Sequence, residues 1–150
     1  MMKGDSIVQF NRGFALINLK KYEKAIECFD KAIKINPNHF IIWNTKGFAL
    51  HSLEKYEKAI ECFDESIRIN PNHSTAWVFK GLALNDLEKY GEAIKCYSEA
   101  IRLEPESLCV WRKKGDALVK LGKYNEAREC FIISQKRKSR VKKHTRKTLS

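Results

Sequence analysis

The chain contains five cysteines and four histidines, side chains that could ligate a metal or attack a substrate. Four of the cysteines recur at intervals of 34 residues: Cys28, Cys62, Cys96 and Cys130. His39 and His73 are separated by the same interval. Side chains with this spacing belong to successive helical units, on the order of 10 Å apart. They form a ladder and not a cluster, so we expect neither a disulfide nor a zinc site.

No other constellation of catalytic residues is apparent. The sequence lacks Cys-x-x-Cys and His-x3-His pairs, and it contains no glycine-rich phosphate loop. The neighbouring acids Asp64 and Glu65 fall on a helix face that we expect to be solvated, and Cys109 stands outside the cysteine ladder. We therefore predict a protein that is not an enzyme and needs no cofactor. Its unpaired cysteines favour the reducing cytoplasm.

Charge is the most unusual property of the composition. Lys and Arg number 29 against 18 Asp and Glu, which gives a formal net charge of +11. Residues 135–150 contain no acid and eight basic residues: Lys136, Arg137, Lys138, Arg140, Lys142, Lys143, Arg146 and Lys147. Such a run is typical of segments that bind nucleic acid or another anionic surface. The segment has no aromatic residue, so contact with a nucleic acid would be sequence-blind. No stretch of 18 apolar residues occurs, which excludes a membrane-spanning helix.

Rare residues reveal an internal repeat of 34 residues. The prolines and tryptophans all follow this interval: Pro37, Pro71 and Pro105, then Trp43, Trp77 and Trp111. Four of the seven glycines follow it as well: Gly13, Gly47, Gly81 and Gly115. A fixed period of this length indicates a solenoid of repeated supersecondary units.

Each repeat contains the pattern of two helices. In the second repeat, the first helix is predicted at about residues 41–53. The second begins at Tyr56 and carries Phe63 on its apolar side. It should end at Asn70, because a residue that precedes a proline is pushed out of the helical conformation.

A 34-residue unit of this kind resembles the tetratricopeptide repeat. The second repeat supplies the pattern as Trp43, Gly47, Tyr56, Ala59, Phe63 and Pro71. The resemblance covers about residues 6–137 and implies an all-α fold, a right-handed α-solenoid of four helix–turn–helix units. We assign the repeats to residues 6–39, 40–73, 74–107 and 108–137, between a lead at residues 1–5 and a basic tail at residues 138–150. Where the family has Leu before its glycine, this chain has Arg12, Lys46, Lys80 and Lys114.

The last predicted helix differs from its counterparts. Arg128, Gln135 and Arg137 occupy columns that hold isoleucine or leucine in the earlier repeats, as expected for a helix that meets water. We therefore expect four repeats to make a complete array. Because no Gly or Pro follows Gly122, this helix should continue past Ser139 to about residue 143.

Three apolar residues follow one another on the same helix: Phe131, Ile132 and Ile133. Ile132 and Ile133 stand in columns that are polar in the other repeats. Either the tail folds back over them, or they form the contact of a homodimer.

The resemblance implies a concave surface, lined by the first helix of each repeat, that binds a peptide or helix of a partner protein. The matching positions are Ile7, Phe10 and Phe14 in the first repeat, Ile41, Asn44 and Phe48 in the second, Val78, Phe79, Leu82 and Asn85 in the third, and Arg112, Lys113 and Asp116 in the fourth. The first three sets are mostly apolar and suit a peptide with apolar anchors, whereas Arg112 and Lys113 suit an acidic end. Phe14 and Phe79 could instead belong to the core between helices.

Family members that bind the acidic ends of heat-shock chaperones use a clamp of Lys, Asn and Arg side chains. Counted from the first repeat, the matching positions hold Phe10, Phe14, Thr45, Thr75 and Phe79; counted from the second, they hold Asn44, Phe48, Phe79, Cys109 and Lys113. Neither set can hold a carboxylate pair. We therefore predict a protein-interaction scaffold without this clamp. The alternatives are a nucleic-acid-associated protein that uses the basic tail and a self-associating structural protein.

Overall fold

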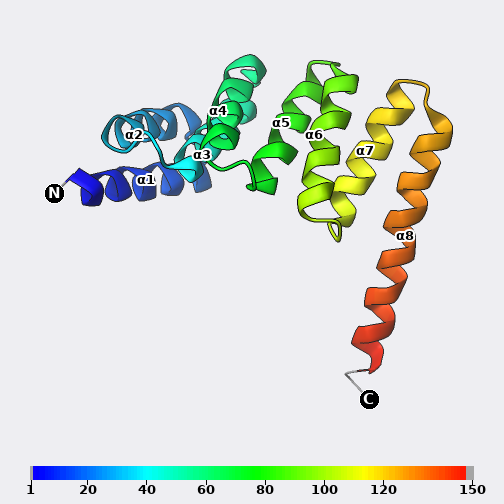
Figure 1. The fold of residues 1–150 in the computed structure, drawn as a ribbon. Helices are drawn as coiled ribbons and strands as arrows, with labels where there is room; N and C mark the ends of the chain where they lie inside the picture. The colour runs from blue at the N-terminus through cyan, green and yellow to red at the C-terminus, as the bar shows by residue number, and fades with distance from the viewer. Residues whose placement is uncertain (1, 148–150) are drawn as a thin grey trace.

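The computed structural model describes residues 2–147, with the side chains of residues 4–136. This part of the chain forms eight helices and no strand: α1 (Met2–Asn18), α2 (Tyr22–Ile35), α3 (Phe40–Ser52), α4 (Tyr56–Ile69), α5 (Ser74–Asp86), α6 (Tyr90–Leu103), α7 (Leu108–Lys120) and α8 (Tyr124–Lys147). Each odd-numbered helix pairs with the next as a hairpin, and the four hairpins stack in chain order (Figure 1). The predicted all-α solenoid of helical hairpins is confirmed.

Each second helix buries one apolar face. In α4, Ala59, Cys62, Phe63 and Ser66 recur at helical spacing, and all four are buried. Burying a phenylalanine side chain such as that of Phe63 contributes roughly 2–3 kcal/mol. The helix ends at Ile69 because Asn70, which precedes a proline, adopts an extended conformation with φ −136°.

A glycine in each first helix lets the two helices of a hairpin approach closely. A Cβ atom added to Gly47 would lie 2.5 Å from Cε1 of the Phe63 ring. Gly13, Gly81 and Gly115 face the rings of Phe29, Tyr97 and Phe131 in the same way. The repeated glycine of each first helix therefore packs against the repeated aromatic ring of the second helix in the same hairpin.

The turn inside each hairpin contains a residue with left-handed backbone. This residue is Lys20, Glu54, Glu88 or Gly122, with φ between 56° and 73°. In the second repeat, the Lys55 N–H donates to the Leu50 carbonyl and the Glu54 N–H donates to the His51 carbonyl. These bonds satisfy carbonyls at the end of α3 and define a Schellman motif. Only the last of the four turns uses the glycine that this conformation favours.

Neighbouring hairpins are joined through their tryptophans and lysines. The Trp43 indole N–H donates to the Pro37 carbonyl at 2.8 Å, and the later tryptophans make the same bond to the carbonyls of Pro71 and Pro105. Lys46 forms an ion pair with Asp30 of the preceding repeat at 2.6 Å. Lys80 and Asp64 form the equivalent pair at 2.5 Å. The basic residues before the glycines therefore connect successive repeats.

Helix α8 is longer than the other helices and extends beyond α7 (Figure 1). The sequence predicted that this helix continues past Ser139 to about residue 143, and it is helical as far as Lys147, the last described residue. The chain has no Gly or Pro after Gly122 that would stop the helix earlier. The side chains of residues 137–147 lie outside the described part.

Candidate binding surfaces

The first helices line one side of the array. Helix α3 contacts both α1 and α5, while the second helices α2, α4 and α6 each pack between the first helices of adjacent hairpins. The first helices therefore lie closer together than the second helices, which places them on the inner, concave side of the curve.

The predicted groove residues differ widely in exposure. Ile7, Phe14, Ile41, Arg112 and Asp116 are exposed; Phe10, Phe48, Val78, Phe79, Leu82, Asn85 and Lys113 are half-buried; Asn44 is buried. The exposed fractions of Ile7, Phe14 and Ile41 are 56%, 49% and 40%. These three residues expose apolar side chains to water at the first two repeats.

Aromatic rings connect the groove to the core. Phe48 and Phe79 meet edge to face with their centroids 5.5 Å apart, and Phe79 stacks on the fully buried Phe63 at 5.9 Å. Phe79 thus belongs partly to the core, as the sequence allowed. Phe10 packs between Phe14, at 6.2 Å, and the core ring of Phe29. These ring contacts connect predicted groove residues on α1, α3 and α5 to the core.

Polar groups in the groove are few. His51 Nε2 lies 2.8 Å from the Asp86 carboxylate, which joins α3 to α5, and its ring also packs on Tyr56. The sequence gave no sign that Asp86 would be the partner of His51. Asn44 is 8% exposed, and its Oδ1 atom accepts no hydrogen bond from the described residues. Its amide is therefore an incompletely satisfied polar group among apolar neighbours.

The groove becomes charged at α7. Arg112 is exposed and Lys113 is half-buried, while the acid Asp116 lies one turn further along. Within the part of the chain that the structure describes, neither basic side chain forms an ion pair. Both can therefore meet an acidic ligand without first losing an internal partner.

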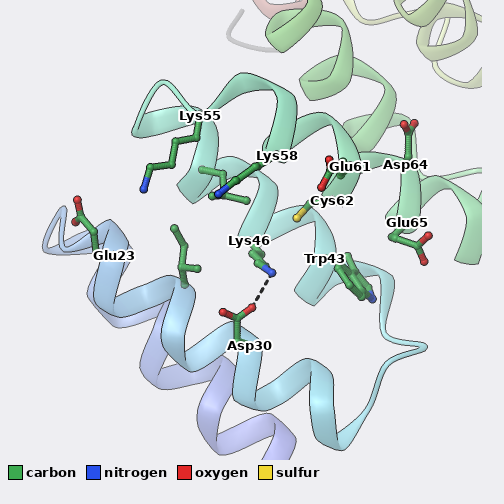
Figure 2. A pocket seen from close by; sticks show the side chains of 12 residues that line it. Glu23, Asp30, Trp43, Lys46, Lys55, Lys58, Glu61, Cys62, Asp64 and Glu65 are labelled. Carbon is green, nitrogen blue, oxygen red and sulfur yellow. Dashed lines mark ion pairs between the residues drawn. The ribbon is translucent and has the colours of Figure 1, made fainter.

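A hollow in the described part of the structure lies between the two outer helices α2 and α4, with α3 as its floor (Figure 2). Its volume is about 800 Å³, and it is lined by Glu23, Ile26, Asp30, Trp43, Lys46, Leu50, Lys55, Lys58, Glu61, Cys62, Asp64 and Glu65. The Lys46–Asp30 pair crosses it. Sequence reasoning missed this hollow. The sequence could have indicated it through the opposite charges at the repeat positions of Lys46 and Asp30, which form an ion pair across the hollow.

The buried thiols of Cys62 and Cys96 are poorly suited to nucleophilic chemistry. Cys28, Cys62, Cys96 and Cys130 are buried, and Cys109 is exposed at the start of α7. Burial raises the pKa of the Cys62 thiol to about 11, and it does the same for Cys96. A nucleophilic cysteine needs the opposite shift. Among the described residues, no group of His, Cys, Asp or Glu side chains could hold a metal ion.

The C-terminal candidates divide between the described and undescribed parts of α8. Ile132 is 37% exposed, whereas Phe131 and Ile133 are half-buried, with the Phe131 ring against Gly115. Of the eight basic candidates, Lys136 is described and exposed. The other seven side chains lie outside the described residues. No helix in the described part has both the length and the apolar character needed to cross a bilayer.

Comparisons with known proteins agree with this geometry. A tetratricopeptide repeat model matches residues 6–39, 40–73 and 74–107, and a second such model matches residues 110–132. No curated protein sequence matches the chain significantly.

Solved structures share the fold. A crystal structure of MamA matches with a TM-score of 0.90 and 19% identity, covering 93% of this chain and 81% of that one. MamA from Desulfovibrio magneticus RS-1 is 27% identical, with a TM-score of 0.85 and coverage of 90% and 76%. The first tetratricopeptide domain of Spaghetti (RPAP3), bound to the HSP90 peptide SRMEEVD, has a TM-score of 0.78 and 22% identity, with coverage of 80% and 95%. The family models cover most of the sequence, and the chain therefore belongs to the tetratricopeptide repeat family, whose fold is a protein-interaction scaffold.

Proposed function

We propose that the chain is a non-enzymatic scaffold that binds a peptide segment of a partner protein in its concave groove. The observation that supports this most is the row of exposed apolar side chains on the first helices, Ile7, Phe14 and Ile41. Exposed apolar patches of this kind mark interaction sites in soluble proteins. The rings of Phe48 and Phe79 are already fixed against each other before a ligand binds. Binding therefore costs little conformational entropy of the protein, and most of the entropy lost is that of the ligand.

The groove also favours one direction for the ligand. Its apolar part belongs to the first three repeats, and its basic part, Arg112 and Lys113, belongs to the fourth. A peptide with apolar anchors at one end and acids at the other would match both parts. The apolar anchors should contribute most of the affinity, and the charges should set orientation.

We also propose that the groove lacks the carboxylate clamp of chaperone-binding relatives. The clamp positions hold Phe10 and Phe14 on α1, and Phe48 on α3, where a terminal carboxylate would need Lys or Asn. An apolar ring cannot replace the hydrogen bonds that a buried carboxylate requires. Calorimetry with the acidic peptide SRMEEVD should therefore give no measurable heat of specific binding. Micromolar binding would contradict the proposal.

The main experiment is selection from a phage-displayed peptide library on the full chain. Enriched peptides should combine two or more large apolar residues with a following acidic stretch. The charge-introducing variants Phe14→Asp and Ile41→Asp should each weaken a selected peptide by tenfold or more. Leu121→Asp is the matched control, because Leu121 is 44% exposed but lies in the turn after α7. Equal binding to all three variants would refute the groove as the site.

The charged end has its own test. Arg112→Glu should change the selection toward peptides without the acidic stretch and should reduce the salt dependence of binding. An unchanged preference would show that the fourth repeat does not contact the ligand.

A second candidate function concerns α8, whose helix continues through the basic run to Lys147. Eight basic residues and no acid lie in residues 135–150, which suits an anionic partner such as nucleic acid. If all eight met duplex phosphates, log K would fall against log salt with a slope of about −7. A gel shift that survives deletion of residues 136–150 would eliminate this candidate.

A further inference from the structure

The side of α1 that faces away from the array is an unpartnered apolar helix face. Val8, Arg12 and Ala15 lie on it, at intervals of four and three residues that place them along one side of the helix. Leu19 follows four residues later, in the turn directly after α1. All four are exposed, Val8 by 62% and Leu19 by 64%. We call these four residues the outer face of α1.

Two of these positions, those of Val8 and Ala15, are buried in every later repeat. The residues equivalent to Val8 are Ile42, Ala76 and Val110, with exposures of 1%, 0% and 5%. Those equivalent to Ala15 are Ala49, Ala83 and Ala117, all at 0%. The second helix of the preceding hairpin covers them, because α2 packs on α3, α4 on α5 and α6 on α7. The outer face of α1 thus has the composition of an interface that the chain forms three times.

The charge on this face also has a counterpart inside the array. Arg12 occupies the column of Lys46 and Lys80, and each of those lysines pairs with an aspartate of the preceding second helix. Arg12 forms no ion pair within the described residues. By position, its missing partner is an acid equivalent to Asp30 or Asp64.

We propose that the outer face of α1 docks an acidic amphipathic helix from a partner protein. That helix would lie where a preceding second helix would lie. It would cover Val8 and Ala15 with aliphatic side chains and place a carboxylate against Arg12. Helix-in-groove recognition of this kind needs apolar residues at helical spacing and one acid on the same face.

A second copy of the chain is a poorer occupant on grounds of charge. The end of the array that could stack on α1 is α8, which offers Arg128 and Ile132 where α2 offers Ile26 and Asp30. No carboxylate would meet Arg12 from these positions, and Arg128 would add a like charge nearby. Like charges oppose such contacts.

This surface is separate from the proposed groove. At about 100° per residue, the outer face lies roughly 120° around α1 from the groove residues Ile7 and Phe14. One molecule could therefore hold a groove peptide and an outer-face helix at the same time. The two proposals stand or fall independently.

A helix taken from the chain itself provides the probe. A fluorescein-labelled peptide of residues 55–70 carries the face that α4 presents to α5, including Ile60, Asp64 and Ile67. An isolated helix of this length is marginally stable, so Glu61 of the peptide is replaced by lysine and its amine is joined to the Glu57 carboxyl group by a lactam. Both positions are exposed in the chain. Fluorescence anisotropy against the full chain measures binding.

The expected results distinguish charge from apolar contact. Arg12→Glu should weaken the peptide by about two- to fivefold, as for an exposed ion pair. A peptide with Asp64→Lys should bind the Arg12→Glu chain with the affinity that the unaltered peptide has for the wild type. The control is Lys31→Glu, which makes the same charge change at an exposed site on α2 and should leave the affinity of the peptide unchanged. Ala15→Asp should weaken binding at least tenfold. Circular dichroism should show that the variants at these exposed sites remain folded.

Three results would overturn the proposal. The first is equal binding to the wild type, Arg12→Glu and Ala15→Asp. The second is loss of binding in Ile41→Asp alone, because the probe would then occupy the groove. The third is concentration-dependent dimerisation in sedimentation velocity that Ala15→Asp abolishes, since a second copy would then be the occupant.

Discussion

Replacing the hairpin glycines by alanine should have different effects in the middle and at the end of the array. In Gly47→Ala, the new Cβ would lie 2.5, 2.8 and 3.0 Å from three atoms of the Phe63 ring. Phe63 is 0% exposed and stacks on Phe79, so its ring has no space to withdraw. Overpacking of a core costs about 1–3 kcal/mol. Alanine recovers about 1 kcal/mol through its greater helix propensity. The net loss of stability should therefore be up to about 2 kcal/mol.

Gly115→Ala creates the same clash, 2.6 Å from Cε1 of Phe131, in a different setting. Phe131 is half-buried on the last hairpin, and its ring can move toward solvent. The propensity gain of about 1 kcal/mol should then offset most of the steric cost. We expect a stability change within about 0.5 kcal/mol of zero, on the scale of ordinary surface substitutions.

Thermal unfolding followed by circular dichroism at 222 nm measures the difference. For a chain of this size, a change of 1 kcal/mol shifts Tm by roughly 2–4 °C. Gly47→Ala should lower Tm by several degrees, and Gly115→Ala should leave it nearly unchanged. In the Gly47→Ala/Phe63→Leu double variant, the two losses should be less than additive, because the smaller side chain removes the clash. Equal losses at the two glycines would refute the reasoning.

Glu54→Gly and Glu88→Gly should each stabilise the chain by about 0.5–1 kcal/mol. Left-handed backbone costs a residue with a Cβ atom about 1–2 kcal/mol, and glycine avoids this cost. Part of the gain is offset because glycine gives the unfolded chain more conformational entropy. A lower urea midpoint would contradict this. Iodoacetamide at pH 8 should modify the exposed Cys109 long before Cys62, whose pKa of about 11 leaves roughly a thousandth of it as thiolate. Peptide mass mapping over time tests the order, and simultaneous labelling would count against it. Burial lowers the pKa of His73 below 6.5, although the nearby charge of Glu104 acts in the opposite direction. As the pH falls below 6.5, the unfolded state therefore binds a proton at this histidine before the folded state does, and the stability of the fold should decrease. His73→Gln should reduce that fall in melts between pH 7 and 5, and identical profiles would exclude this histidine as a cause.

Repetition made much of the fold predictable. The spacing of Trp43, Pro37 and Gly47 assigned residues to equivalent positions, and the helical pattern around Phe63 identified the buried face. The resemblance to a known repeat then supplied the direction of curvature and the groove. Helix boundaries followed closely, since the second helix of this repeat begins at Tyr56 as expected.

Contacts between columns were harder to predict. A period shows which residues are equivalent, but it does not show which columns touch. Lys46 therefore appeared as a departure from the family pattern until the structure placed it against Asp30. The repeat interval identified Gly47 as one of four equivalent glycines, whereas its contact with Phe63 emerged from the packing. Left-handed backbone at Glu54 left no trace in the sequence, because glutamate is an uncommon choice there.

Exposure in the groove was the least predictable property. Phe10 and Phe14 are the same residue type one turn apart, yet one is half-buried and the other is 49% exposed. The difference arises because Phe10 reaches the ring of Phe29 on α2. A helical pattern alone cannot separate the two, since both lie near the same edge of the apolar side.

The bonds from the tryptophan indoles to the proline carbonyls have a spectroscopic consequence. Each indole is fixed to one inter-repeat turn, so its emission reports on one junction of the array. Opening of that junction would break the bond and expose the indole to water, which shifts its fluorescence to longer wavelength. A chain that keeps Trp77 and carries phenylalanine at the other two positions would follow the central junction alone. The array thus contains its own optical probes for observing whether the hairpins separate together or one at a time.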